Sequence, residues 1–401
     1  MRKFFAAMAC GLTAGYALVR AAQTLDAMRK PRTRLRKDPA SYGRLRRKLE
    51  VAALARSVAF ALALSDGKVA ASIVRVAERL PGWLQPPTLV LAASAAGMVL
   101  DFPADYIEGY ELERRYDLSD QPFGAWMRDH VKASLIGALV LTALSAAFST
   151  VIARKPKTWP LLATAGTLPL MILTALVVPV YLAPLFNEFT PLEGPVEKRL
   201  RRLAKRFGVD DVDILRVDMS RQTKKANAYV TGMFRTHRIV LGDTLIESFA
   251  SDEIEFVVAH ELGHYIAKDV WRMTFLAMLA GGLTFRLANL GATERLSPTA
   301  RFVQISARVT LLSALMRPLV ATFSRSREWA ADGFALAATC DPASAVSALE
   351  RLRDQNLAED QIPAWYEILF ASHPSLGNRV AAARTAEWRV PSQAARPVRS
   401  L

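Results

Sequence analysis

Cysteine and histidine are scarce in this 401-residue chain, which limits how it could bind a metal. There are two cysteines, Cys10 inside an apolar run and Cys340 near the C-terminal third, and five histidines. Two cysteines so far apart cannot form a disulfide framework or a cysteine-based zinc cluster. A metal site must therefore be built from histidine and carboxylate side chains.

Acidic residues are outnumbered, because 37 Asp and Glu stand against 52 Lys and Arg and leave a net charge of +15. Such an excess can mark a nucleic-acid-binding protein, but here the basic residues cluster at 29–48 and 199–206, beside apolar segments. We interpret the charge as facing anionic membrane lipids and expect no nucleic-acid partner. With 52% hydrophobic residues and a mean hydropathy of +0.16, the chain is expected to lie partly in a membrane.

Seven apolar segments are candidate membrane spans. The first follows a short basic start, as in a signal peptide, but no small-residue cleavage site precedes Gln23, so a retained anchor is favoured. The second is short and carries Arg56, so a six-span protein remains an alternative. The segments are 4–19, 51–64, 88–106, 131–153, 159–186, 271–290 and 303–323.

The distribution of basic residues predicts an orientation for this multi-pass protein. If the amino terminus is outside, the basic stretch 29–48 is cytoplasmic, and the long loop 187–269 lies on the same side. The basic connection 154–157 argues mildly against this arrangement. We expect the catalytic region to face the cytoplasm, and the Ala- and Arg-rich composition, typical of a bacterial chromosome, suggests the inner membrane of a bacterium.

Four parts of the chain are expected: membrane helices in 1–186, a soluble protease region in 187–269, two more membrane helices in 270–323, and a C-terminal helical region in 324–401. Helical periodicity, strand-like runs and turn residues predict the elements outside the membrane. These are helices at 196–207, 245–266, 328–339 and 343–356, and strands at 212–217, 228–230 and 237–241.

The segment His260-Glu261-Leu262-Gly263-His264 carries the clearest chemistry. On a helix, histidines four residues apart lie on one face, close enough to bind a single zinc ion. Glu261 lies beside the first ligand, where its carboxylate can accept a proton from the attacking water and return it to the leaving amine. The alternative is a purely structural helix, in which the two histidines only form ordinary hydrogen bonds and bind no metal.

A third protein ligand is needed to leave one position open for catalysis. The extended form of this motif has a third histidine six residues after the second, but position 270 is valine. The candidates are then a downstream carboxylate or His373. Glu328 follows an apolar span that could return the chain to the metal, and it is our choice. Asp332, one helical turn later, suits an acceptor for a ligand imidazole N–H, although both acids could simply form a solvated face.

With these residues in place, the chain resembles the type I CAAX prenyl endopeptidases, membrane zinc proteases of the M48-type clan. The order and spacing of the family's motifs hold from about residue 85 to 385, whereas the first eighty residues match little. The matching segments are Phe102-Pro103, Glu113-Arg114-Arg115-Tyr116, Trp126-Met127-Arg128-Asp129, APLFNEFTPL (183–192), NAYVTG (227–232) and RIVLGDTL (238–245).

The resemblance implies a mainly α fold: a polytopic membrane barrel of about seven helices enclosing a chamber, with a zincin-like domain that carries a small β-sheet. It implies one zinc ion held by His260, His264 and Glu328, with Asp332 behind them. Three further roles follow from it. An edge strand at Asn227, Ala228 and Tyr229 could bind substrate, and His373 or Arg379 could stabilise the oxyanion or brace the site.

The implied activity is hydrolysis of a peptide or protein near the C-terminus of a prenylated CAAX sequence, beside membrane lipids. Nothing in the residues shows a prenyl pocket, so a quality-control protease for membrane proteins, with no prenyl requirement, is the rival. A non-catalytic membrane scaffold or transporter with structural zinc is the second alternative. A closed structural site would need no acid at position 261, which weighs against it.

Overall fold

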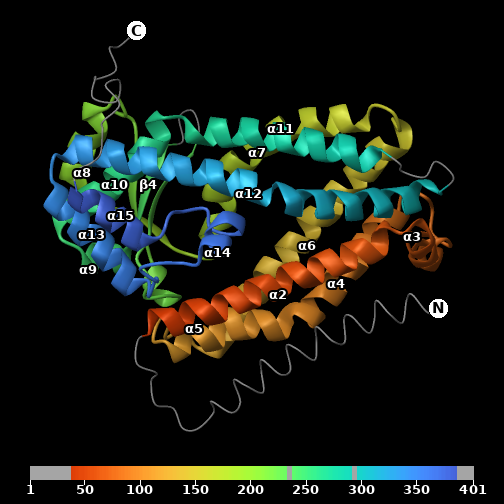
Figure 1. The fold of residues 1–401 in the computed structure, drawn as a ribbon, viewed down its shortest axis with the longest axis horizontal. Coiled ribbons are helices and arrows are strands. Elements are labelled where there is room, and N and C mark those ends of the chain that lie inside the picture. The colour runs from red at the N-terminus through yellow and green to blue at the C-terminus, as the bar shows by residue number, and fades with distance from the viewer. Residues whose placement is uncertain (1–37, 233–236, 291–295, 386–401) are drawn as a thin grey trace.

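A computed structural model describes residues 38–232, 237–290 and 296–385 of the chain. The predicted first span at 4–19 and the loose tail from Arg389 lie outside these residues. Figure 1 shows long helices running along the molecule, with a small sheet and short helices gathered at one end.

The first half of the described chain is helical. Asp38 caps the first helix by accepting a hydrogen bond from the amide of Ala40 at 3.1 Å. The helices and helical turns are α2 (Pro39–Ser65), α3 (Gly67–Val74), η1 (Arg75–Ala77), α4 (Gln85–Tyr106), η2 (Ile107–Glu111), α5 (Leu112–Arg115), α6 (Phe123–Arg154), α7 (Trp159–Val177), η3 (Val178–Leu182) and η4 (Ala183–Leu185).

The second half alternates short strands and helices before two long helices. The elements are β1 (Phe189–Pro191), α8 (Pro195–Arg206), β2 (Asp213–Val217), η5 (Met219–Arg221), β3 (Ala228–Thr231), β4 (Arg238–Gly242), α9 (Asp243–Ser248), α10 (Ser251–Ile266), α11 (Asp269–Asn289), α12 (Pro298–Thr339), α13 (Pro342–Gln355), α14 (Ala364–Leu369) and α15 (Leu376–Thr385).

Four helices of the described residues are long and apolar enough to cross a membrane, and a fifth span is possible if α2 and the bent segment after it count as one. The four are Gln85–Arg115, Phe123–Arg154, Trp159–Leu185 and Pro298–Thr339. The predicted span at 271–290 forms α11, whose 21 residues are long enough but not apolar enough to meet the same criteria. Large apolar side chains such as Leu139 (67% exposed) and Leu161 (72% exposed) point outward, as they do where lipid replaces water.

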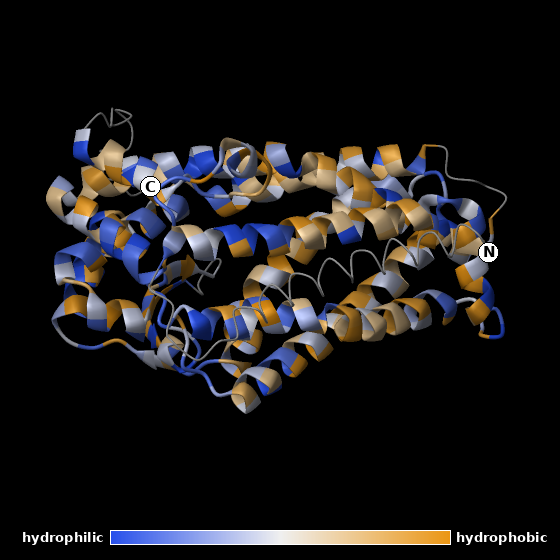
Figure 2. Ribbon diagram, turned by 60° about the horizontal axis from the view of Figure 1, so that its bottom comes forward, coloured by the Kyte–Doolittle hydropathy of each residue, from blue (hydrophilic) through white to orange (hydrophobic). Residues whose placement is uncertain are grey.

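Apolar and polar surfaces separate along the molecule. Figure 2 shows the apolar residues concentrated on the long helices and the polar ones at the end that carries the sheet. The fold is thus mainly α, with several apolar helices and a small mixed sheet, as the sequence predicted.

The sheet has the order β1-β2-β4-β3, which leaves β3 at an edge. β2 runs parallel to β4, whereas β1 and β3 are antiparallel to their neighbours. The short strand β1 was not predicted, because it has only three residues, the last of them Pro191, and so shows no alternation of apolar and polar residues.

Two predicted helices differ from the structure. The helix expected over 245–266 is two helices, α9 and α10, because Phe249 and Ala250 adopt extended backbone angles between them. The helix expected from 328 is not separate from the last span, since α12 continues through 42 residues. One rigid element therefore joins the membrane part to the buried core around α10.

Helices α10 and α12 approach closely at Gly263. A Cβ atom at this position would lie 3.2 Å from the Cα of Ala331 and 3.1 Å from the ring of Phe334. Only glycine fits without moving the α12 backbone, so this residue sets the distance between the two helices. The core beneath them is formed by fully buried apolar side chains, among them Ile239, Leu241, Leu245, Phe256 and Leu262.

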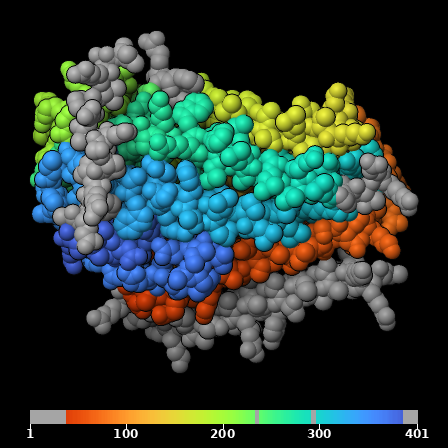
Figure 3. Space-filling model, turned by 45° about the horizontal axis from the view of Figure 1, so that its top comes forward, coloured from red at the N-terminus to blue at the C-terminus, as the bar shows by residue number. Residues whose placement is uncertain are grey.

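The C-terminal segment returns to the first described helix. In Figure 3 the residues before α15 lie directly against α2 on the visible face. Glu359 forms an ion pair with Arg47, and Tyr366 donates a hydrogen bond to Glu50. The segment that carries His373 is thus tied to α2.

Candidate metal centre

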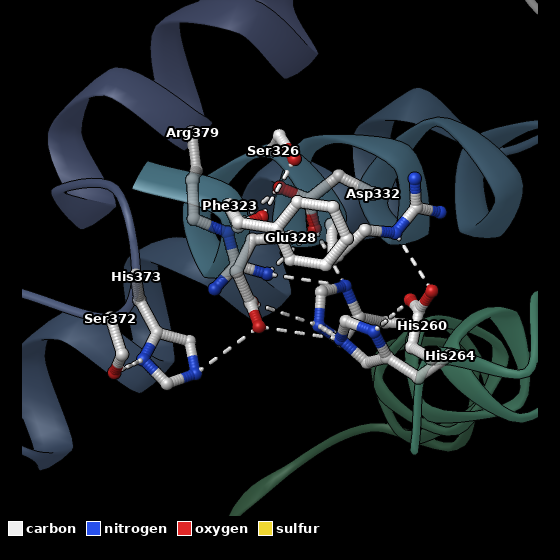
Figure 4. A network of polar contacts seen from close by, with 11 residues as sticks. His260, His264, Phe323, Ser326, Glu328, Asp332, Ser372, His373 and Arg379 are labelled. Atoms are coloured by element: carbon white, nitrogen blue, oxygen red, sulfur yellow. Dashed lines mark hydrogen bonds and ion pairs between the residues drawn. The ribbon is translucent and has the colours of Figure 1, made fainter. Parts of the chain in front are cut away.

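Helix α10 begins at a well-formed N-terminus and is not interrupted by proline. Glu253 accepts a hydrogen bond from the amide of Ala250 at 2.8 Å, and Asp252 and Glu253 lie in the first turn, where negative charge is favourable. The helix presents His260 and His264 on one face toward α12, which contributes Glu328 (Figure 4).

Three donor atoms converge where these helices meet. His260 Nε2 lies 3.2 Å from His264 Nε2 and 3.4 Å from Glu328 Oε2, and His264 Nε2 lies 3.4 Å from Glu328 Oε1. Donor atoms ~2.0–2.1 Å from a tetrahedral zinc ion are roughly 3.3–3.4 Å apart. The separations therefore fit a metal of this size.

The hydrogen bonds behind the imidazoles also point to a cation. Both Nδ1 atoms face carboxylates, Asp332 at 2.8 Å and Asp269 at 3.0 Å, so neutral histidines would carry their protons there. Two Nε2 lone pairs and the Glu328 carboxylate would then face one another. Glu328 Oε2 is buried and finds no hydrogen-bond donor among the described residues. A divalent cation would satisfy all three groups.

His260 is held by a buried carboxylate and a buried guanidinium. Asp332 Oδ1 lies 2.8 Å from His260 Nδ1, and Arg379 donates to both oxygens of Asp332 at 2.8 and 2.6 Å. The side chains of Asp332 and Arg379 are 1% and 10% exposed. Arg379, from α15, thus touches the back of the site rather than its open side.

His264 has a similar arrangement that sequence reasoning missed. Asp269 Oδ2 lies 3.0 Å from His264 Nδ1, and its Oδ1 accepts hydrogen bonds from Arg327 at 2.7 Å and Arg272 at 3.4 Å. Lys268 adopts a left-handed conformation (φ 56°) that ends α10 and turns Asp269 back toward the histidine. An acidic residue five positions after the second histidine was the available signal.

These contacts shift the acid–base properties of the site. Burial alone would lower the pKa of His264, but its hydrogen bonds to Asp269 and Glu328 outweigh burial and raise the pKa to about 9. Burial raises the pKa of the Glu261 carboxyl above its usual range, although both histidines oppose the shift. A carboxyl with a raised pKa is suited to exchanging protons near neutral pH.

Glu261 lies between the histidines and the edge strand. The backbone amide of Val230 in β3 is near enough to its carboxylate to favour the charged form. This contact fits the sheet register, because the amide of Gly242 bonds to Asn227 O at 2.9 Å and the ladder then alternates. The main-chain groups of Tyr229 and Thr231 therefore face β4, and those of Ala228 and Val230 face the open edge.

The three residues predicted to bind substrate, Asn227, Ala228 and Tyr229, lie in different environments. The main chain of Ala228 faces the open edge, Tyr229 bonds within the sheet, and Asn227 is exposed just before the strand. Val230 was not predicted, although it contacts Glu261.

His373 lies on the far side of Glu328 from the two ligand imidazoles (Figure 4). Its Nε2 is 3.3 Å from Glu328 Oε1, its Nδ1 is 2.8 Å from Ser372 Oγ, and its side chain is 62% exposed. Desolvation by neighbouring protein atoms lowers its pKa, despite the attraction of the Glu328 carboxylate. The imidazole borders the metal centre on its open side.

Two family profiles cover most of the chain. The profile of peptidase family M48 matches residues 192–387, and the profile described as CAAX prenyl protease N-terminal, five membrane helices, matches residues 37–188. The chain belongs to peptidase family M48. It is therefore a membrane-integrated metalloprotease, and its substrates are peptides or proteins.

Individual relatives agree with this assignment. An uncharacterised metalloprotease of Bacillus subtilis is 29% identical over 316 residues, which cover 74% of this chain and 73% of that protein. CAAX prenyl protease 1 of Saccharomyces cerevisiae is 27% identical over 316 residues, covering 72% and 70%. The crystal structure of Ste24p from S. mikatae has the same fold, with a TM-score of 0.70 at 24% identity over 94% of this chain and 96% of that one.

Proposed function

We propose that the chain is a zinc endopeptidase that cleaves near the C-terminus of membrane-anchored peptides of the prenylated CAAX type. The observation that carries the proposal is the convergence of His260, His264 and Glu328 beside Glu261 and an open strand edge. Relatives named CAAX prenyl protease 1 supply the substrate class.

His260, His264 and Glu328 hold the metal, which leaves one coordination position open. Zinc, when bound there, acts as a Lewis acid toward the scissile carbonyl and the attacking water. The ligand set of two imidazoles and one carboxylate favours zinc over harder ions such as magnesium.

Glu261 is the general base and then the general acid of this proposal. Its buried position and raised pKa let it accept a proton from the attacking water and return it to the leaving amine at neutral pH. His373, on the open side of Glu328, can donate a hydrogen bond to the oxyanion. Arg379 braces the site through Asp332, because its guanidinium is occupied there.

The edge strand β3 aligns the substrate. An extended peptide can add to the sheet by pairing with the main-chain groups of Ala228 and Val230. Since the Val230 amide also reaches Glu261, such a peptide would lie with its backbone beside the base. Asn227 lies at the start of this path, and Tyr229 flanks it from within the strand.

The protein would act from the membrane, with its protease region on the cytoplasmic side and lipids as neighbours. If the source is bacterial, this is the inner membrane.

The test is cleavage by detergent-purified protein of a farnesylated CAAX peptide, the same peptide without the lipid, and an unfolded membrane-protein fragment. Glu261→Gln is the matched control, with zinc measured in both proteins. We expect about one zinc per chain in each and a large loss of activity, on the order of 100-fold or more, in the variant. Preference for the unlipidated fragment would favour quality control. Full zinc with no peptide cleaved would refute the peptidase.

A further inference from the structure

The segment just before the edge strand is held by one side chain in an unusual way. Asn356 Oδ1 accepts a hydrogen bond from the amide of Ala226 at 2.8 Å, and Asn356 Nδ2 donates to Ala226 O at 3.2 Å. Both polar main-chain groups of one residue are thus paired with one amide, as in a strand ladder. Ala226 is 4% exposed, so water does not replace these bonds.

Asn356 itself is fixed by its neighbours. It follows the last residue of α13, and the next residue, Leu357, has a left-handed conformation (φ 52°), which is unfavourable for a branched side chain. The Leu357 side chain is buried with Tyr42 and Leu112 from the membrane part. Burial of this side chain maintains the turn, and the turn aims the Asn356 amide at Ala226.

Other contacts fix the same segment from two sides. Gln355 Nε2 donates to Lys224 O at 2.8 Å, and Thr244 Oγ1 donates to Lys225 O at 2.8 Å. Lys225 Nζ lies 2.8 Å from Glu113 Oε1, so the segment is also joined to the end of a membrane helix. Burial lowers the pKa of Lys225, and the ion pair with Glu113 opposes this shift by stabilising the charged ammonium group.

We propose that Asn356 is a positioning residue for substrate recognition: it fixes Ala226 and thereby the register in which β3 presents Ala228 and Val230 to the substrate. A shift of one residue would exchange the main-chain groups that face β4 with those that face the open edge. The inference rests on the proposed use of β3 as the substrate-binding strand.

The test compares Asn356→Ala and the nearly isosteric Asn356→Asp with wild type, on an extended peptide and on a truncated one too short to pair with both Ala228 and Val230. For the extended peptide we expect KM to rise about tenfold with kcat within about twofold, because Asn356→Ala loses both hydrogen bonds, whereas Asn356→Asp keeps the acceptor for the Ala226 amide but turns a carboxylate oxygen toward Ala226 O. The truncated peptide should show no such rise, and zinc content should be unchanged. The control is Asn289, the last residue of α11, whose side-chain amide also makes two hydrogen bonds, to Trp159 and Arg301. Asn289→Ala should change neither KM nor kcat.

Hydrogen exchange gives a reading that does not depend on catalysis. The amides of Tyr229 and Thr231 should exchange about tenfold faster in both Asn356 variants, while those of α10 stay protected. Unchanged exchange in β3, or an equal loss on both peptides, would overturn the role of Asn356. If wild type binds zinc yet cleaves no peptide, the proposed function fails instead, and the exchange result still decides whether Asn356 holds the strand.

Discussion

His260 and His264 are each backed by an aspartate and an arginine, but the two groups lie in different surroundings. Asp332 and Arg379 behind His260 are 1% and 10% exposed. Asp269 and Arg327 behind His264 are 8% and 20% exposed, and His264 itself is 23% exposed against 8% for His260. The same hydrogen-bonding pattern is therefore fully buried behind His260, whereas behind His264 the arginine and the imidazole are partly exposed to water.

The difference separates two functions of such a group. A buried carboxylate and guanidinium must remain paired, because either alone would be an uncompensated charge in the interior. Asp269 is also buried, but Arg327, at 20% exposed, can exchange the carboxylate for water at little cost. We infer that Asp332 and Arg379 stabilise the fold as well as the metal site, whereas Asp269 and Arg327 act mainly on the metal site.

Removing Asp332 should have the largest effect. In Asp332→Ala, Arg379 loses its counter-ion and His260 its acceptor, so we expect the free energy of unfolding to fall by ~3–5 kcal/mol and metal affinity to drop about 10- to 100-fold. Thermal unfolding in detergent and zinc titration measure the two effects. The double variant Asp332→Ala with Arg379→Ala should recover part of the stability but not the affinity. An unchanged unfolding midpoint in the single variant would contradict a structural role.

Asp269→Asn should weaken zinc binding with little loss of fold stability. The amide keeps the volume but loses the charge, so we expect zinc affinity to fall about tenfold and stability to change by less than ~1 kcal/mol, because water reaches the site. Competition with a chelator and thermal unfolding check this. If stability falls as far as in Asp332→Ala, exposure does not explain the difference between the two groups.

The sequence allowed one of these groups to be predicted and not the other. Asp332 lies on the same helix as Glu328 and one turn away, so helical spacing alone put it behind the ligands. Asp269 follows the second histidine by five residues, but the left-handed turn at Lys268 that directs it toward His264 has no sequence signal, because lysine rarely adopts this conformation. Arg379 came only from the family resemblance, since a contact across the fold leaves no local signal.

In the fold, too, features with a local sequence signal were predicted and contacts between distant residues were not. Long apolar runs predicted the membrane helices, and the spacing of His260 and His264 predicted a helix. The continuity of α12 was missed, because the polar residues after its apolar part read as a new element. Asn356 could not be found from the sequence, since its contact with Ala226 joins residues 130 positions apart.

The pH dependence of metal binding should sharpen the comparison. With a pKa of about 9, His264 of the metal-free protein carries a proton at neutral pH, and zinc needs the neutral imidazole. Zinc affinity should therefore increase with pH from 6 to 8, by about tenfold per pH unit for each proton released. Asp269→Asn removes one of the two hydrogen-bond partners that raise this pKa, the other being Glu328, and should flatten the slope above pH 7. Titration in buffers of different ionisation enthalpy counts the protons, and an unaltered slope in the variant would show that Asp269 does not control the protonation of His264.

The smallest effects should distinguish the two arginines that bond to the same oxygen of Asp269. Arg327 donates from 2.7 Å and is 20% exposed, whereas Arg272 donates from 3.4 Å and is 49% exposed. Because a short, partly buried ion pair orients a carboxylate better than a long, exposed one, Arg327→Gln should weaken zinc binding about threefold and Arg272→Gln hardly at all. Both substitutions remove one positive charge that bonds to the same oxygen of Asp269, so a general electrostatic effect would strengthen binding of the cation in both variants instead of weakening it. Chelator competition at low and high salt tells these outcomes apart, since only the general effect should disappear as salt rises.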